Sequence, residues 1–205
     1  MKKIFLICLS VITLFTSAIV GGTIIFEDHF NENENGWDLG QKESANILIK
    51  DGKLFFECKK YLGNGGGYWV KAPDLSLPET GFTVKCNTKW VKNHLENDTY
   101  SPYGFIIANY YFLIYADGER RLLFYNTETK SYETIVDWGS STAIKTTTTG
   151  ENQFEIVYKD GKVSFYCNGE MLYKKPINFK DGERLKLYTE KSEVVEFDDL
   201  IVTKD

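Results

Sequence analysis

The chain has 205 residues and a mass of 23.6 kDa, and 42% of its residues are hydrophobic and 15% aromatic. This composition supplies a sizeable apolar core, which excludes an intrinsically disordered protein, and the length suits a single domain. The formal net charge of −5, without a basic stripe, excludes a typical nucleic-acid-binding protein.

Residues 1–22 have the features of a secretory signal peptide. Lys2 and Lys3 precede an apolar run from Ile4 to Phe15, and the small residues of Thr16–Ala18 offer a cleavage site. An uncleaved membrane anchor is the alternative, because the apolar stretch approaches the length that spans a bilayer. We predict cleavage, with the mature chain secreted, periplasmic or at the cell surface and not inserted in the membrane.

Residues 23–205 are predicted to form short antiparallel strands within one domain. Asp-Gly or Asn-Gly steps at 51–52, 117–118, 160–161 and 168–169 supply the positive φ angles that tight hairpin turns need. Alternating apolar residues place the strands at 23–30, 46–50, 53–59, 67–71, 80–91, 103–108, 110–116, 120–126, 132–137, 153–159, 162–167, 170–173, 184–189 and 193–203.

So many strands cannot remain in one open sheet without curling or splitting into two layers. We therefore predict an all-β fold, a two-sheet antiparallel β-sandwich of the jelly-roll type, with a closed barrel as the alternative. Glycine-rich or polar segments at 63–67, 93–102 and 139–150 are expected to be loops.

Four segments follow one another in the order FEDHFNENENGW (Phe26–Trp37), YGFIIA running into YFLIYADG (Tyr103–Gly118), NQFEIVYKDG with its hairpin partner (Asn152–Gly169), and EFDDLIV (Glu196–Val202). Together they resemble the laminin-G-like or concanavalin A-like jelly-roll domains of secreted bacterial proteins. The resemblance implies two antiparallel sheets, with the strand near Phe26 close to the strand near Phe197. That superfamily mixes carbohydrate-binding modules with glycan-cleaving enzymes, so membership does not choose between them.

Glycoside hydrolysis usually requires a pair of carboxyl groups. In the laminarinase-type hydrolases of this superfamily, a Glu-x-Asp-x-x-Glu strand turns these groups to one face. The closest string here is Glu196–Ile201, in which Ile201 replaces the last glutamate. We interpret this string as an edge strand with an acidic outer face, and the departure argues against hydrolysis by this route.

The segment Asn31–Gly36 resembles the start of a calcium loop, with oxygen-bearing side chains at alternate positions and glycine sixth. An EF-hand needs a glutamate at position twelve, which Lys42 occupies here. A polar turn after the first strand is therefore the favoured interpretation. A calcium site of another kind, sharing Asp28, Asp198 or Asp199, is the alternative, and no other cofactor is predicted.

The cysteines and histidines predict no site of their own. Cys58, Cys86 and Cys167 can form at most one disulfide, and buried thiols in strands are the favoured interpretation. His29 and His94 lie far apart in the sequence without nearby cysteines. We therefore assign them neither a zinc site nor a catalytic role.

Aromatic residues concentrate in the middle strands, where they can pack in the core or stack on sugar rings. Neighbouring tyrosines at 110 and 111 must point to opposite faces of a strand, so one of them is expected in the core. Arg120 and Arg121 follow a turn and are expected to supply hydrogen-bond donors at the same rim. The candidate ligand-binding residues are Tyr110, Tyr111, Tyr115, Arg120, Tyr125 and Trp138.

With no catalytic residue predicted, the favoured function is non-catalytic binding of a polysaccharide or cell-surface glycan. One alternative is a glycoside hydrolase of a related jelly-roll group, whose carboxylates the sequence does not pair. The other is a structural or adhesion module of the cell envelope, which would show a large exposed apolar patch.

Overall fold

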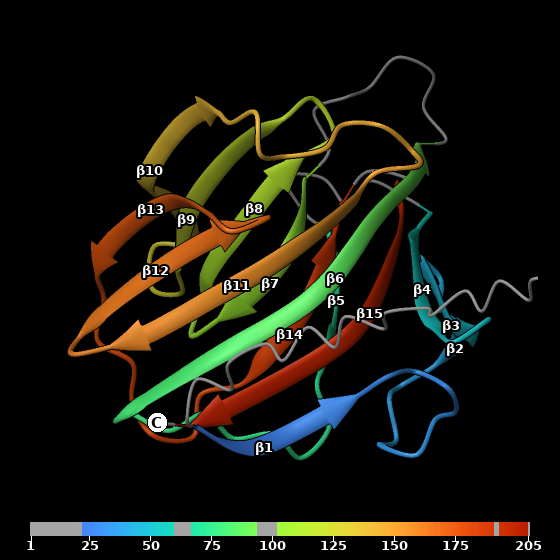
Figure 1. Cartoon of the computed structure of the whole chain (residues 1–205), viewed down its shortest axis with the longest axis horizontal. Coiled ribbons are helices and arrows are strands. Elements are labelled where there is room, and N and C mark those ends of the chain that lie inside the picture. Colours follow the sequence, from blue (N-terminus) through green and yellow to red (C-terminus); the bar gives the residue numbers. More distant parts are fainter. Residues whose placement is uncertain (1–21, 60–66, 94–101, 191–192, 205) are drawn as a thin grey trace, which may run out of the picture.

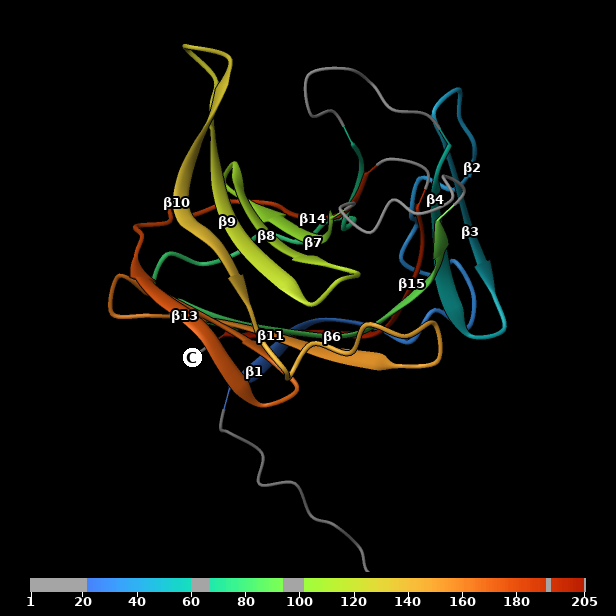
Figure 2. The same cartoon turned by 90° about the horizontal axis from the view of Figure 1, so that it is seen from above.

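The computed structural model describes residues 22–59, 67–93, 102–190 and 193–204. These residues form fifteen strands in two antiparallel sheets that pack face to face (Figures 1 and 2). The predicted all-β sandwich is therefore confirmed. No helix in these ranges has the length and apolar character needed to cross a membrane. The predicted signal peptide lies outside the described residues except for its last position, as do His94 and most of the segments 63–67 and 93–102.

The strands are β1 (Thr23–Asp28), β2 (Gly40–Gln41), β3 (Ala45–Lys50), β4 (Lys53–Cys58), β5 (Tyr68–Lys71), β6 (Gly81–Asn93), β7 (Pro102–Ile107), β8 (Tyr110–Tyr115), β9 (Glu119–Asn126), β10 (Ser131–Ser140), β11 (Glu151–Lys159), β12 (Lys162–Cys167), β13 (Glu170–Pro176), β14 (Leu185–Thr189) and β15 (Glu193–Lys204). Every predicted strand is present, with ends that differ by a few residues. The short strand β2 was not predicted.

Hairpin turns form where the Asp-Gly and Asn-Gly steps predict them. Both residues of the turns at 51–52, 160–161 and 168–169 have positive φ, from 51° at Asp160 and Asn168 to 81° at Gly169. Each of these turns closes a two-residue hairpin. At 117–118 only Gly118 has positive φ, and the connection between β8 and β9 is longer.

The larger sheet has the strand order β13-β12-β11-β6-β15-β4-β3-β2, with β1 also paired to β15. The smaller sheet has the order β10-β9-β8-β7-β14-β5. Figure 2 shows the smaller sheet lying over the larger one, with its own β9–β10 hairpin rising at one side and the β2–β3–β4 end of the larger sheet rising at the other. The central strands of the smaller sheet therefore lie between two raised edges.

The core fills the space between the two sheets, and aromatic rings from both sheets meet there. Phe105 of β7 contacts Phe154 of β11 and Phe197 of β15, with ring centroids 5.5 and 6.1 Å apart. Phe112 of β8 meets Phe165 of β12 at 5.9 Å. Because residues alternate along each strand, every strand of the smaller sheet turns its other residues away from the core.

The strand β15 lies inside the larger sheet, so its interpretation as an edge strand was wrong. It pairs with β6 on one side and with β4 and β1 on the other. Polar residues alternate with core residues in any strand that has one solvated face, so the pattern does not separate edge from central strands. The expected neighbourhood of the two ends is confirmed, since Phe26 of β1 pairs with Val202 of β15 (Figure 1).

The three cysteines of the described residues are buried thiols and form no disulfide with one another. Cys86 in β6 contacts the carbonyl oxygens of Asn87 and Asp198, each at 3.3 Å. Burial raises the pKa of the Cys86 thiol, and it raises the pKa of Cys167 to about 12. Both thiols are therefore protonated at neutral pH and chemically inert.

Candidate functional site

The face of the smaller sheet that points away from the larger sheet, here called the outer face, is rich in aromatic residues. Its side chains alternate with the buried core residues of the same strands. Across the smaller sheet the strands follow the order β5, β14, β7, β8, β9 and β10. In that order, strand pairing and ring contacts place these residues on the outer face: Trp69 and Lys71; Lys186 and Tyr188; Gly104 and Ile106; Tyr111, Leu113 and Tyr115; Glu119, Arg121, Leu123 and Tyr125; and Tyr132, Thr134 and Trp138.

One line of these residues, here called the central row, crosses all six strands. Each member lies opposite the next in the strand pairing, and the last, Trp138, stacks on Arg121 at 4.7 Å from its ring centroid. At about 4.8 Å per strand, five steps make the row about 24 Å long. The row consists of Trp69, Tyr188, Gly104, Leu113, Arg121 and Trp138.

The two ends of the central row are exposed, whereas its middle is a packed platform. The exposed fractions are 48% for Trp69 and 44% for Trp138, against 3% for Tyr188 and 2% for Leu113. Gly104 has no side chain, so the row is lowest between Tyr188 and Leu113. An extended ligand could lie along such a platform with a tryptophan at each end.

The tyrosines of the outer face contact one another edge to face or at a tilt. Tyr111 lies 5.2 Å from Tyr188 and 5.3 Å from Tyr132, and Tyr132 lies 5.0 Å from Tyr125. Burial raises the pKa of Tyr188, and the carboxylate of Glu190, which accepts its hydrogen bond at 2.9 Å, raises it further. The Tyr188 hydroxyl therefore stays protonated at neutral pH. Tyrosine hydroxyls such as those of this face can both donate and accept hydrogen bonds.

Four of the six predicted ligand-binding residues lie together on the outer face: Tyr111, Tyr115, Tyr125 and Trp138. Tyr115 and Trp138 contact each other with ring centroids 4.6 Å apart. The prediction that Tyr110 and Tyr111 face opposite sides is confirmed. Tyr110 turns inward and packs on Phe124 at 4.8 Å, so it is not part of this face.

The structure also separates Arg120 from the other predicted residues. Arg120 lies opposite the buried Ile114, so it points to the inner side, where its guanidinium lies 6.0 Å from the ring of Tyr173. The next residue, Arg121, takes its place on the outer face and donates a hydrogen bond to Thr134 at 2.9 Å. Neighbouring residues of a strand point to opposite faces of the sheet, and the sequence does not show which of the two arginines points outward.

Sequence reasoning missed the β5 and β14 part of the face. Trp69, Lys186 and Tyr188 lie far in the sequence from the tyrosine-rich strands β8–β10, and only the sheet order brings them together. A cavity of about 760 Å³ adjoins this edge of the sheet. Its lining includes Trp69 and Lys71 together with the polar side chains of Asn35, Asp38 and Asp74.

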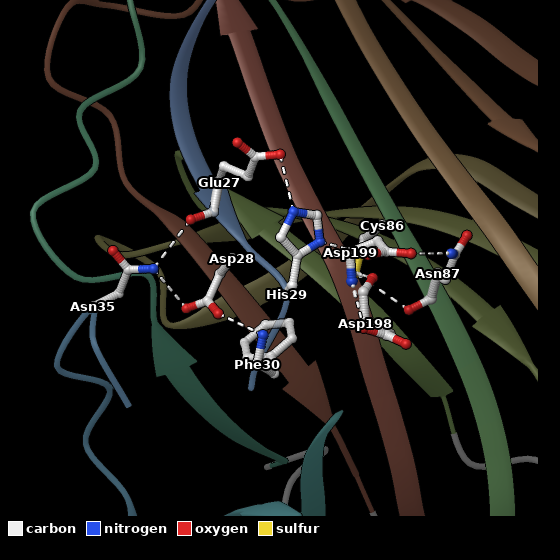
Figure 3. Close-up of polar contacts among 9 residues, drawn as sticks. All are labelled: Glu27, Asp28, His29, Phe30, Asn35, Cys86, Asn87, Asp198 and Asp199. Atoms are coloured by element: carbon white, nitrogen blue, oxygen red, sulfur yellow. Dashed lines mark hydrogen bonds and ion pairs between the residues drawn. The ribbon is translucent and has the colours of Figure 1, made fainter. Parts of the chain in front are cut away.

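The candidate calcium ligands lie elsewhere, around the end of β1 and the bulge in β15 (Figure 3). Asp28 is buried and accepts three hydrogen bonds, from the Phe30 backbone N–H at 2.7 Å, the Asn35 amide at 2.8 Å and the Trp37 indole at 2.7 Å. In the described ranges no three His, Cys, Asp or Glu residues are arranged to hold a metal ion. The calcium site stays a prediction, which thermal unfolding with and without calcium would test.

His29 is half-exposed and lies between two carboxylates (Figure 3). Its Nδ1 is 2.7 Å from Oδ1 of Asp199, and its Nε2 is 3.0 Å from Oε1 of Glu27. The hydrogen bond with Asp199 is the main cause that raises the pKa of His29, Glu27 adds to it, and burial opposes it. His29 thus links the end of β1 to β15.

We expect this contact to make stability depend on pH. The His29 pKa is higher in the folded protein than its ordinary value of 6.5, so the contact stabilises fully below that pH and is lost as the pH rises through the folded pKa. A proton NMR titration should give a His29 pKa above 6.5, and Asp199→Asn should lower it. Asp198→Asn, which does not touch His29, is the control. A wild-type pKa at or below 6.5 would contradict the assignment.

Comparisons with known proteins identify the fold. No family model and no curated protein matches the chain. The GlcNAcα1-4Gal-releasing endo-β-galactosidase from Clostridium perfringens is similar, with a TM-score of 0.64 and 10% identity over 89% of this chain and 63% of that one. The chain thus spans less than two thirds of that enzyme. A Bacillus subtilis protein of unknown function with a galectin-like fold has a TM-score of 0.61 and 9% identity, covering 89% and 96%.

A third similar structure is AlgAT5, an alginate lyase from polysaccharide lyase family 7. Its TM-score is 0.55 at 12% identity, and the match covers 81% of this chain and 84% of that one. The chain has the fold of the concanavalin A-like superfamily. Identities this low establish the fold and nothing beyond it.

Within this concanavalin A-like fold, the acidic string of β15 is remote from the outer face. Phe197 points into the core, so Glu196 and Asp198 point away from the smaller sheet. Glu196 is instead ion-paired with Lys53 at 3.3 Å. Acids on or next to the described outer face include Glu119, at the start of β9, Asp117 just before it, which acts on Tyr115, and Glu190, which follows β14.

Proposed function

We propose that this protein binds a glycan along the central row of the outer face without cleaving it. Sugar rings present C–H faces that stack on aromatic planes, and the row carries an exposed tryptophan at each end. Tyrosine hydroxyls and the Arg121 guanidinium supply hydrogen bonds beside it. The polysaccharide-degrading enzymes among the similar structures support a glycan as the ligand.

The observation that supports the non-catalytic part is the spacing of the strands that carry the acids. Glu119 and Glu190 belong to one end of the face, at β9 and β14, with β8 and β7 between them. Three strand steps separate the backbones of β14 and β9 by about 14 Å. The Glu190 carboxylate itself reaches toward Tyr115 and Tyr132, with which it interacts electrostatically. Glycosidases that use two carboxyl groups hold them about 5–10 Å apart. The central strand β8 contributes Tyr111, Leu113 and Tyr115 to this face and no acid.

A glycan array followed by titration calorimetry would test binding. We expect Trp69→Ala and Trp138→Ala each to weaken the affinity for the best polysaccharide about tenfold or more, as aromatic residues at binding hot spots do. Met171→Ala is the matched control, because Met171 is 51% exposed on the other sheet. If no polysaccharide binds, or if all three variants bind equally well, the proposal fails.

Glycoside hydrolysis is the second candidate, because the Glu190 carboxylate accepts a hydrogen bond from Tyr188, a member of the central row. The same glycan panel should be assayed for newly formed reducing ends. We expect none with the wild-type protein. Release that Glu190→Gln abolishes would establish an enzyme instead. An envelope module with a protein partner would show neither glycan binding nor release.

A further inference from the structure

Two lysines face each other at the β5 edge of the outer face. Lys186 of β14 pairs directly with Lys71 of β5, so their side chains share one face with Cβ atoms about 5 Å apart. Like charges directly opposite one another destabilise a sheet. Neither lysine forms an ion pair with any residue in the part of the chain that the structure describes.

The surroundings of this lysine pair are partly desolvated and aromatic. The Nζ atom of Lys186 lies 4.4 Å from the ring centroid of Trp69, which is 48% exposed. Burial lowers the pKa of Lys186; Glu183 opposes this change, and Lys71 adds to it. A partly buried charge beside a second like charge carries a free-energy cost that an anionic ligand would relieve.

Acidic residues also lie near the lysine pair, and Glu183 acts on Lys186 directly. Asp38, in the adjoining cavity, is ion-paired with Lys42 at 2.6 Å. Asp74 also lines that cavity. Glu119 and Glu190 belong to the other end of the strands, beyond the central row. On the outer face itself, the β5 edge thus presents two adjacent positive charges, in a chain whose net charge is −5.

We propose that the glycan bound by the outer face carries acidic sugars, and that Lys71, Lys186 and Trp69 form the subsite for one of them. The sugar ring stacks on the side of Trp69 that Lys186 does not cover, and the two ammonium groups bind the carboxylate or sulfate group of the sugar. The cavity beside β5 accommodates the part of the sugar that extends past the edge strand. This inference rests on the proposed function, since it names the chemical class of the same ligand.

Calorimetry with three groups of polysaccharides tests the inference. The carboxylated group is polygalacturonate and alginate, the sulfated group is carrageenan and heparin, and the neutral group is laminarin, galactan and dextran. We expect the tightest binder to be acidic, and we expect its affinity to fall as sodium chloride increases. Which acidic group binds tighter distinguishes a carboxylate from a sulfate ligand.

Lysine variants then show which positive charges bind the acidic polysaccharide. The double variant Lys71→Gln/Lys186→Gln should weaken the acidic ligand about tenfold or more, because two charge-assisted contacts are lost. Lys162→Gln/Lys174→Gln removes the same charge from exposed positions of the larger sheet and should change little.

Three outcomes would overturn the inference. If a neutral glycan binds tightest and depends on Trp138 but not on the lysines, the inference fails and the proposed function stands. If both double variants weaken binding equally, the effect is general attraction and not this subsite. If no polysaccharide binds, both proposals fail together.

Discussion

Asp28→Ala is expected to lower the free energy of unfolding by about 3–4 kcal/mol, because buried N–H donors lose their acceptor. Asp28 is 6% exposed and accepts hydrogen bonds from the Phe30 backbone and the Trp37 indole, which are themselves buried. A third donor is the Asn35 side chain. The carboxylate thus holds the end of β1, the polar turn after it and a core tryptophan together.

Two further variants separate the lost hydrogen bonds from other effects. Asp28→Asn keeps one acceptor oxygen and replaces the other with a donor, so we expect a smaller loss of about 1–2 kcal/mol. Asp38→Ala is the matched control, since Asp38 is exposed and its ion pair with Lys42 contributes little. Urea unfolding monitored by circular dichroism gives the three values. Equal losses for Asp28→Ala and Asp38→Ala would refute this account.

The contacts of Asp28 give a structural role to the segment Phe26–Trp37, a role that the sequence alone does not show. The segment Phe26–Trp37 resembles other jelly-roll domains, and its run of oxygen-bearing residues suggested either a calcium loop or a polar turn. In the structure Asp28 binds the indole of Trp37, and Asn33 binds the Trp37 backbone N–H at 2.7 Å. An aspartate and a tryptophan nine positions apart carry no pattern of strand or turn that would reveal this contact.

Local features of the fold were predictable, because they depend on residues close in sequence. Alternation located the strands, and Asp-Gly or Asn-Gly steps located three two-residue hairpins. The strand β2 was not predicted, because its two residues, Gly40 and Gln41, are too few to show the alternation of apolar and polar residues. The turn between β7 and β8 also has positive φ at both residues, Ala108 and Asn109, but lacks the glycine that marks the others.

The candidate site was only half predictable, because it depends on which strands are neighbours. Tyr111 and Trp138 could be proposed from the density of aromatic residues in β8–β10. Trp69 and Lys186 join them only because β14 pairs with β7 and β5, an order that the chain sequence does not encode locally. Arg120 and Arg121 are equivalent in sequence, and strand parity alone decides which one faces outward.

Gly104→Ala is expected to lower the free energy of unfolding by about 3–5 kcal/mol, from backbone strain and overpacking together. Gly104 has a φ of 150°, and a Cβ atom placed there would clash with the carbonyl oxygen of Phe112 and lie 3.5 Å from Cα of Leu113. The obstacle is backbone of β8, which cannot rotate away as a side chain would. The strands β7 and β8 would have to separate at the middle of the outer face.

A second glycine isolates the clash from the backbone angle. Gly169 has a φ of 81°, but a Cβ atom placed there would have no neighbour within 4 Å, so Gly169→Ala should lose only about 1 kcal/mol. Urea unfolding compares the two variants, and an equal loss would show that the β8 backbone yields easily. Because Gly104 is also the lowest point of the central row, Gly104→Ala should weaken glycan binding even in the fraction that folds. Gly169→Ala, on a hairpin of the larger sheet, should leave glycan binding unchanged.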